Sequence, residues 1–231
     1  MKRLTSGLFS SSKSFRPLST ISPRCTSCGN ADTSGGCGLC LIKCKGCGFL
    51  LPRPEGTNYF SLFCAPPSFT INNSSLRHQY LKMQRLLHPD NYSSADGRLQ
   101  ELSAKWSALL NQAYETLKDP QRRANYLYQI MTGKDVDGED NTLDSKGSSP
   151  EIGALLSEVM EIRLDLDDAT DPQQVQAIMD ENWRHTEQIY RELGEAFNNK
   201  DVTKIRTLLI MLRYRKSIED VAKEILGTMD Q

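Results

Sequence analysis

Apolar residues recur at helical spacing along the chain from about residue 58 onward. After a short apolar turn over 58–63, four apolar positions follow at spacings of 4, 3 and 4 residues: Leu76, Tyr80, Met83 and Leu87. This places them on one face of a helix. The polar residues 72–75 can cap the start of this helix. Pro89 ends it, because proline disfavours the helical conformation at the preceding residue. Beyond a polar loop to about Gly97, a second helix carries apolar residues at spacings of 3 and 4: Leu99, Leu102, Trp106, Leu109, Ala113 and Leu117. Asp119-Pro120 ends this helix, and a short helical continuation follows.

The second half of the chain is also helical in pattern. A polar, acidic segment over 133–149 separates it from the first half. Three helical patterns then follow: 150–169, 172–199 and 202–227. The first two begin at Pro150 and Pro172, where proline is tolerated, and short connections between long amphipathic helices predict a bundle of antiparallel neighbours. The fold class is therefore all-α, with Trp183 and Phe197 expected in the bundle core.

The helix predicted over 150–169 carries two apolar stripes. The first has the spacing of an ordinary core stripe: Ile152, Leu155, Val159, Ile162 and Leu166. The second is offset from it and bordered by acidic Glu161 and Asp168: Leu156, Met160 and Leu164. Such a second stripe indicates either a groove for a partner or a helix buried on two sides. Tyr214 can contribute to the same face or to the core.

Charge is unevenly distributed, although the formal net charge is −1. Residues 1–53 hold eight Lys and Arg against one acid, Asp32, a net of +7, so the remainder carries −8. Residues 1–24 are rich in basic residues, Ser and Thr and contain no acidic residue, which is typical of a mitochondrial transit peptide. The alternative is a disordered basic tail. No apolar run reaches the roughly 18 residues of a membrane span. The acidic body argues against nucleic-acid binding.

Six of the seven cysteines form three CxxC pairs: Cys25/Cys28, Cys37/Cys40 and Cys44/Cys47. Two CxxC turns complete a four-thiolate zinc site. Fifteen residues lie between Cys28 and Cys44, within the range of a zinc ribbon, whereas eight lie between Cys28 and Cys37. We therefore predict one structural Zn²⁺ per chain on the first and third pairs, Cys25, Cys28, Cys44 and Cys47, with Cys37 and Cys40 as spare or alternative ligands. An iron–sulfur cluster and disulfides, which a reducing compartment disfavours, are the alternatives. Cys64 is expected as a buried small apolar residue.

His88-Pro89-Asp90 lies between the two amphipathic helices of the first half. The first of these helices carries basic residues off its apolar face: Arg77, His78, Lys82 and Arg85. With YFSLF, LRHQYLKMQRLLHPD and NQAYETLKDPQRRANY in this order, residues 57–132 resemble the J-domain. The resemblance implies that the tripeptide and the basic helix contact a DnaK-type chaperone and stimulate ATP hydrolysis by that partner. The chain itself is then not an enzyme, and no nucleophile accompanies His88 as a catalytic base.

The helix LLSEVMEIRLDLDD after a J-domain, together with CxxC pairs before NYFSLF, resembles the HscB-type co-chaperones of iron–sulfur cluster assembly, and in particular their mitochondrial members. The resemblance implies that the bundle binds the cluster scaffold protein, through residues carried over by position: Leu156, Met160, Glu161, Asp168 and Tyr214. Leu164 belongs to the same stripe. Two departures are noted: Ser157 and Leu164 stand where the family typically has apolar and acidic residues, and Cys37/Cys40 are outside its pattern.

The resemblance also implies a division of the chain and a role. The expected parts are a transit peptide, a zinc module, a J-domain, an acidic linker and a three-helix bundle that binds the scaffold: 1–24, 25–53, 57–132, 133–149 and 150–228. The expected role, in the mitochondrial matrix, is to deliver the scaffold to a DnaK-type chaperone and promote cluster transfer. The alternative is a general J-protein that serves unfolded mitochondrial clients.

Overall fold

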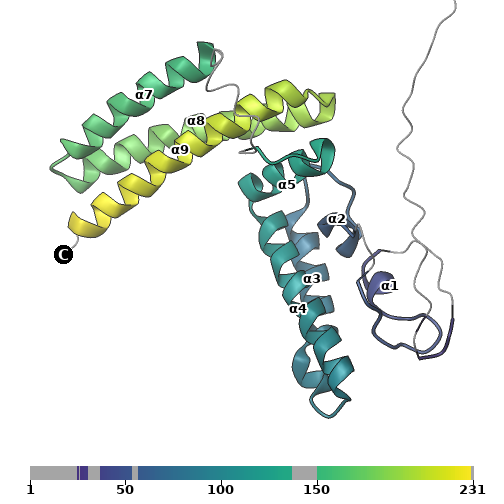
Figure 1. The fold of residues 1–231 in the computed structure, drawn as a ribbon. Coiled ribbons are helices and arrows are strands. Elements are labelled where there is room, and N and C mark those ends of the chain that lie inside the picture. Colours follow the sequence, from purple (N-terminus) through teal and green to yellow (C-terminus); the bar gives the residue numbers. More distant parts are fainter. Residues whose placement is uncertain (1–24, 26, 31–36, 54–56, 137–149, 230–231) are drawn as a thin grey trace, which may run out of the picture.

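Helices make up most of the described part of the chain (Figure 1). The structure is a computed structural model that describes residues 25, 27–30, 37–53, 57–136 and 150–229. In order, its helices are α1 (Leu39–Ile42), α2 (Tyr59–Leu62), α3 (Asn73–Leu87), the 3₁₀ turn η1 (Pro89–Tyr92), α4 (Gly97–Lys118), α5 (Pro120–Thr132), α7 (Pro150–Asp167), α8 (Pro172–Asn199) and α9 (Val202–Met229). The all-α fold class is thus confirmed. The expected transit peptide over 1–24 and most of the expected linker lie outside the described residues.

Capping residues explain where the helices begin and end. Four helices, α3, α4, α5 and α8, follow a residue whose side-chain oxygen accepts a backbone N–H at 2.7–2.9 Å: Asn72, Asp96, Asp119 and Asp171. Pro120 and Pro172 occupy first-turn positions, where no intrahelical N–H bond is lost. Gly133 closes α5 in the left-handed conformation, at φ 71°.

Helices α3 and α4 pack along each other as a hairpin, and α2 and α5 close its upper end (Figure 1). The buried apolar side chains of these helices form one core: Phe60, Leu62, Leu76, Met83, Leu87, Trp106, Leu110, Ala113, Leu117, Ala124 and Leu127. The Tyr59 backbone N–H also donates to the Tyr126 hydroxyl at 2.9 Å, and the two rings stack. These contacts join α2 to α5 across the domain.

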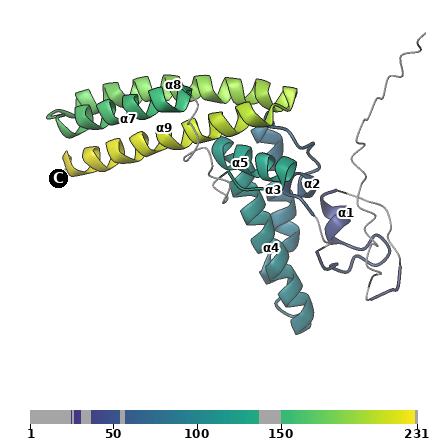
Figure 2. The same ribbon diagram turned by 45° about the horizontal axis from the view of Figure 1, so that its top comes forward.

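The core of this hairpin domain continues into the bundle. Buried residues of α8 and α9, among them Leu193 and Ile205, belong to the same apolar cluster as α3 and α4. Phe69, in the loop before α3, stacks on Phe197 of α8 at 5.5 Å between centroids. The hairpin therefore attaches directly to one end of the α8–α9 pair, and the molecule is L-shaped in Figures 1 and 2.

Helix α7 covers the other end of the bundle (Figure 2). Its buried side chains form a second core with those of α8 and α9: Leu155, Val159, Leu166, Val175, Ile218 and Ala222. This confirms the core stripe expected on α7. Of the helices in the described ranges, none combines the length and apolarity that crossing a bilayer requires.

The prediction for one bundle aromatic is wrong. Trp183 is 54% exposed, whereas Phe197 packs against the core as expected. Helix α8 turns Asn182 and Thr186 inward, and Trp183 lies about 100° further round the helix than Asn182. Asn182 holds the inner position because its side-chain amide donates to the buried Arg215 carbonyl at 3.0 Å.

Candidate functional sites

The His88-Pro89-Asp90 loop is braced at the end of α3. The last carbonyls of a helix lack intrahelical partners. Here three side chains donate to them: Asn91 to Arg85 O at 2.7 Å, Tyr92 to Leu86 O at 3.1 Å, and Ser103 to Leu87 O at 2.9 Å. Ser103 is fully buried on α4, so its bond ties the loop to the neighbouring helix. These three residues were not predicted. For Asn91 and Tyr92 the available signal was a polar side chain just beyond the helix end, whereas Ser103 is 16 residues away from Leu87 in the chain.

The side chains of the tripeptide itself point into solvent. Helix α3 ends at Leu87, and His88 adopts an extended ψ of 131°, as expected before proline. His88 Nδ1 accepts the Asp90 backbone N–H at 3.3 Å and lies 3.3 Å from an Asp90 carboxylate oxygen. Both side chains are exposed, so a rigid turn presents an imidazole and a carboxylate to a partner.

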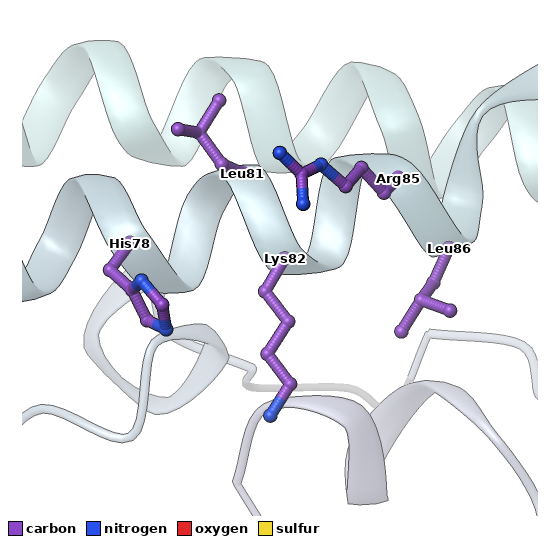
Figure 3. Close-up of a pocket in the computed structure, with 5 residues that line it drawn as sticks. All are labelled: His78, Leu81, Lys82, Arg85 and Leu86. Atoms are coloured by element: carbon purple, nitrogen blue, oxygen red, sulfur yellow. The ribbon is translucent and has the colours of Figure 1, made fainter.

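Basic and apolar residues alternate on the outer face of α3, and five of them line a shallow groove, here called the α3 groove: His78, Leu81, Lys82, Arg85 and Leu86. Figure 3 shows these side chains projecting from neighbouring turns of the helix. Among the described residues, none of the three basic side chains forms an ion pair.

Two of the groove residues were not anticipated. Leu81 and Leu86 are exposed apolar residues, and they lie off the buried stripe of α3. Arg77 is also exposed, one turn before Leu81, but it does not line the groove. The face can thus offer apolar contact as well as positive charge to an acidic partner.

The second stripe of α7 is exposed. Met160 and Leu164 are 69% and 64% exposed, and Leu156 is half-buried. The bordering Glu161 and Asp168 are exposed as well. Of the two interpretations of this pattern, a helix buried on two sides is therefore wrong for the described part of the chain.

Tyr214 lies on α9, outside the exposed stripe of α7. It is half-buried against the second core, and the Arg213 guanidinium lies 5.4 Å from the centre of its ring. Its tyrosine ring thus has a structural contact, and its exposed part remains available at the surface.

An ion pair between a buried arginine and a partly exposed glutamate holds α7 on the bundle. Arg215 is only 4% exposed, and its guanidinium donates to Glu158 of α7 at 2.7 Å. The Asn182 side chain donates to the Arg215 carbonyl, so the arrangement joins all three bundle helices. It fixes the helix that displays Met160 and Leu164.

Four cysteines of the N-terminal module converge: Cys25, Cys28, Cys44 and Cys47. Their sulfur atoms all lie within 4.8 Å of one another, and the Cys25–Cys47 and Cys28–Cys44 sulfur pairs are 3.6 Å apart. A tetrahedral zinc ion with Zn–S bonds of about 2.3 Å requires sulfur atoms about 3.8 Å apart. The donor set and spacing are therefore compatible with a bound metal ion.

The two halves of this cysteine site repeat one turn. Gly29 N–H donates to Cys25 O and Gly48 N–H to Cys44 O, each at 2.8 Å. Both glycines adopt a positive φ, 71° and 73°, which explains why glycine follows the second cysteine of each pair. The Cys28 backbone N–H is the main cause that lowers the pKa of Cys25 to about 6. The Asn30 backbone N–H lowers the pKa of Cys28, but the Cys47 side chain, burial and the other thiols raise it to about 12. The thiols therefore hold their protons unequally, and Cys25 is the one that most readily becomes a thiolate.

The cysteine module packs on the hairpin domain. Ile42 and Leu50 are fully buried in the same apolar cluster as α3 and α4. The Trp106 indole N–H of α4 donates to the Leu51 carbonyl at 2.7 Å. The module is thus an integral part of the folded domain rather than a separate appendage.

Three cysteines lie outside the four-cysteine site, and the prediction for one of them is wrong. Cys64 is exposed and forms a disulfide with Cys37, so the expectation that Cys64 is a buried apolar residue is wrong. Cys64 follows α2 in a left-handed conformation, φ 53°, which turns its side chain towards the cysteine module. Cys40 is free and exposed.

Comparisons with known proteins agree with this architecture. Residues 59–126 match the family model described as the DnaJ domain, and residues 153–223 match the HSCB C-terminal oligomerisation domain. The chain is 32% identical over 204 residues to the mouse iron-sulfur cluster co-chaperone protein HscB, covering 88% of this chain and 83% of the mouse protein. It is 28% identical to the mitochondrial J-type co-chaperone JAC1 of Saccharomyces cerevisiae, covering 76% of this chain and 92% of the yeast protein.

A solved structure is also similar. The crystal structure of the human co-chaperone protein HscB matches with a TM-score of 0.76 at 27% identity. The match covers 87% of this chain and 97% of the human chain.

Proposed function

Because the chain belongs to the HscB family of iron–sulfur cluster co-chaperones, we propose that it binds the cluster scaffold protein, delivers it to a mitochondrial DnaK-type chaperone and stimulates the ATPase of that chaperone. The released cluster then passes to recipient proteins. The family is one of co-chaperones and not of catalytic enzymes, so the bond chemistry belongs to the partner. The observation that carries the proposal is the presence of two separate exposed surfaces on one rigid frame.

The first surface is assigned to the chaperone. It consists of the braced tripeptide His88, Pro89 and Asp90 together with the α3 groove and Arg77. Basic side chains that form no ion pair with any other described residue favour encounter with an acidic partner surface, and the exposed Leu81 and Leu86 add apolar area to bury. The bracing of the loop lowers the entropic cost of holding Asp90 in one position on binding.

The second surface is assigned to the scaffold. It consists of the exposed α7 stripe and its acidic border, with Tyr214 at the side: Leu156, Met160, Leu164, Glu161 and Asp168. An exposed apolar stripe with a polar rim is the usual composition of a protein interface. It lies on the bundle end distant from the α3–α4 hairpin (Figure 1), so both partners have room to bind together.

The four convergent cysteines are assigned to one Zn²⁺ ion per chain. With four thiolate ligands the ion has no open position for water, and it would serve structure rather than catalysis. Zinc would join the two CxxC turns, whose own apolar cluster is small. The mitochondrial location is also proposed, on the composition of residues 1–24 and on the mitochondrial yeast relative.

The decisive experiment measures ATP hydrolysis by a mitochondrial DnaK-type chaperone with and without scaffold protein. The wild type is expected to stimulate hydrolysis, and to do so more strongly with scaffold present. Asp90→Ala is expected to lose stimulation under both conditions while still binding scaffold in a pull-down. Equal stimulation by Asp90→Ala and wild type would remove the proposal. Enhancement by unfolded proteins but not by scaffold would favour the general J-protein instead.

A further inference from the structure

The Cys37–Cys64 disulfide is a covalent link between two parts of the molecule. It joins residues 27 positions apart, with their Cα atoms 5.0 Å from each other. Cys37 precedes α1 in the cysteine module, and Cys64 follows α2 in the hairpin domain. Both residues are exposed, so thiols in solution can reach the bond.

Gly38 permits the two segments to approach this closely. Its backbone N–H donates to Ser61 O at 2.9 Å. A Cβ atom at Gly38 would lie 2.9 Å from Cys64 Sγ and 3.4 Å from Leu62 O, and the residue has a φ of +58°. Only glycine tolerates both conditions, so the chain provides a fitted contact at the disulfide.

A third cysteine lies in the same turn. Cys40 is free and exposed, and its backbone N–H donates to Cys37 O at 3.2 Å. A turn of this type brings its end Cα atoms within about 7 Å, close to the span of a disulfide. Cys40 does not belong to the four-cysteine metal site.

We propose that Cys37, Cys40 and Cys64 form a thiol–disulfide exchange site that tethers the cysteine module to the hairpin domain and releases it. Cys40 is the resolving thiol. Its thiolate attacks Cys37 Sγ, a Cys37–Cys40 bond forms, the Cys37–Cys64 bond breaks, and Cys64 leaves as a thiolate that takes up a proton. One disulfide replaces another, so this step needs no oxidant or reductant.

The ratio of small-molecule thiols to disulfides in solution determines whether the three cysteines hold a disulfide or are all reduced. A disulfide oxidant such as oxidised glutathione forms the Cys37–Cys64 bond from two thiols and leaves two reduced glutathione molecules. After release, the module stays joined to the hairpin domain by the polypeptide backbone and by non-covalent contacts, among them the Trp106–Leu51 hydrogen bond and the packing of Ile42. The inference is independent of the proposed partners.

The first test maps the disulfides of the full-length, zinc-loaded chain. The protein is equilibrated in glutathione buffers of stepped redox ratio, trapped with an alkylating agent and digested without reduction. We expect Cys37–Cys64 peptides with alkylated Cys40, in exchange with Cys37–Cys40 peptides with alkylated Cys64. Cys40→Ser is expected to yield the Cys37–Cys64 peptide alone. Absence of Cys37–Cys64 peptides at every ratio would overturn the site, and absence of the Cys37–Cys40 peptide would overturn the resolving role.

The second test measures the tether by amide hydrogen exchange. Reducing the wild type, or substituting Cys64→Ser, is expected to speed exchange at Gly38 and Leu51 at least about tenfold, because the covalent constraint is lost. Oxidised Cys40→Ser is the matched control and is expected to exchange like the oxidised wild type. The wild-type comparison needs no substitution, so it stands even if a variant misfolds. Unchanged exchange on reduction would show that the disulfide does not hold the module.

Discussion

Truncating the two exposed large apolar residues of α7 is expected to abolish tight scaffold binding without disturbing the fold. The change is the double substitution Met160→Ala and Leu164→Ala. Both side chains lie outside the two apolar cores, so the free energy of unfolding is expected to change by no more than about 0.5 kcal/mol for each.

The size of the binding loss follows from the exposed fractions. Met160 and Leu164 are 69% and 64% exposed in the free chain. Complete burial of a Met or Leu side chain is worth about 1.5–3 kcal/mol, so burying the exposed two-thirds of each contributes about 1–2 kcal/mol. The double variant therefore loses about 2–4 kcal/mol of binding free energy, or roughly 30- to 1000-fold in Kd.

Isothermal titration of scaffold protein into each variant, at one fixed salt concentration, measures this loss. Trp183→Ala is the matched control, because Trp183 is a large exposed apolar residue on α8 that lies outside the stripe. It is expected to bind like the wild type. A double variant that is folded and binds within threefold of the wild type would refute the assignment. Loss of self-association instead of scaffold affinity, measured by sedimentation, would assign the stripe to a second copy of the chain.

Three further predictions concern the frame that carries these surfaces. Trp106→Phe removes the indole donor to the Leu51 carbonyl and is expected to lower the free energy of unfolding in urea by about 1–3 kcal/mol. Scaffold affinity is expected to stay unchanged. An unchanged unfolding midpoint would show that this hydrogen bond does not hold the cysteine module on the hairpin domain. Glu158→Gln leaves the buried Arg215 charge poorly compensated and is expected to destabilise the chain by about 1–3 kcal/mol. Arg215→Met removes the charge at similar volume and is expected to destabilise the chain less. The opposite order of the two losses in unfolding free energy would count against the ion pair. Protons compete with a bound metal ion for the four thiolates, so metal release to a chromogenic chelator is expected to rise as the pH falls from neutral into the acid range, and equal release at neutral and at acid pH would argue against a thiolate site.

Local structure depends on residues that are neighbours in the chain, and it was predictable from them. Helix α3 ends where Pro89 disfavours a helical His88, and Asn72 caps its start, since these effects act over a few neighbouring residues. The all-α class followed from the spacing of apolar residues in the same way. The four cysteines that converge were predictable as well, because each CxxC turn is local geometry and the 15 residues between Cys28 and Cys44 match the loop of a zinc ribbon.

Which helix faces are covered depends on contacts between segments that are distant in the chain. The pattern of α7 allowed either exposure or burial of Met160, and the contacts of α7 with α8 and α9 left it in solvent. Trp183 lies outside because Asn182, bonded to Arg215 across the bundle, takes the inner position. Cys64 meets Cys37 because a left-handed turn and Gly38 bring two distant segments together. In each case the deciding neighbour is far away in the chain, and a pattern that repeats every three or four residues carries no information about it.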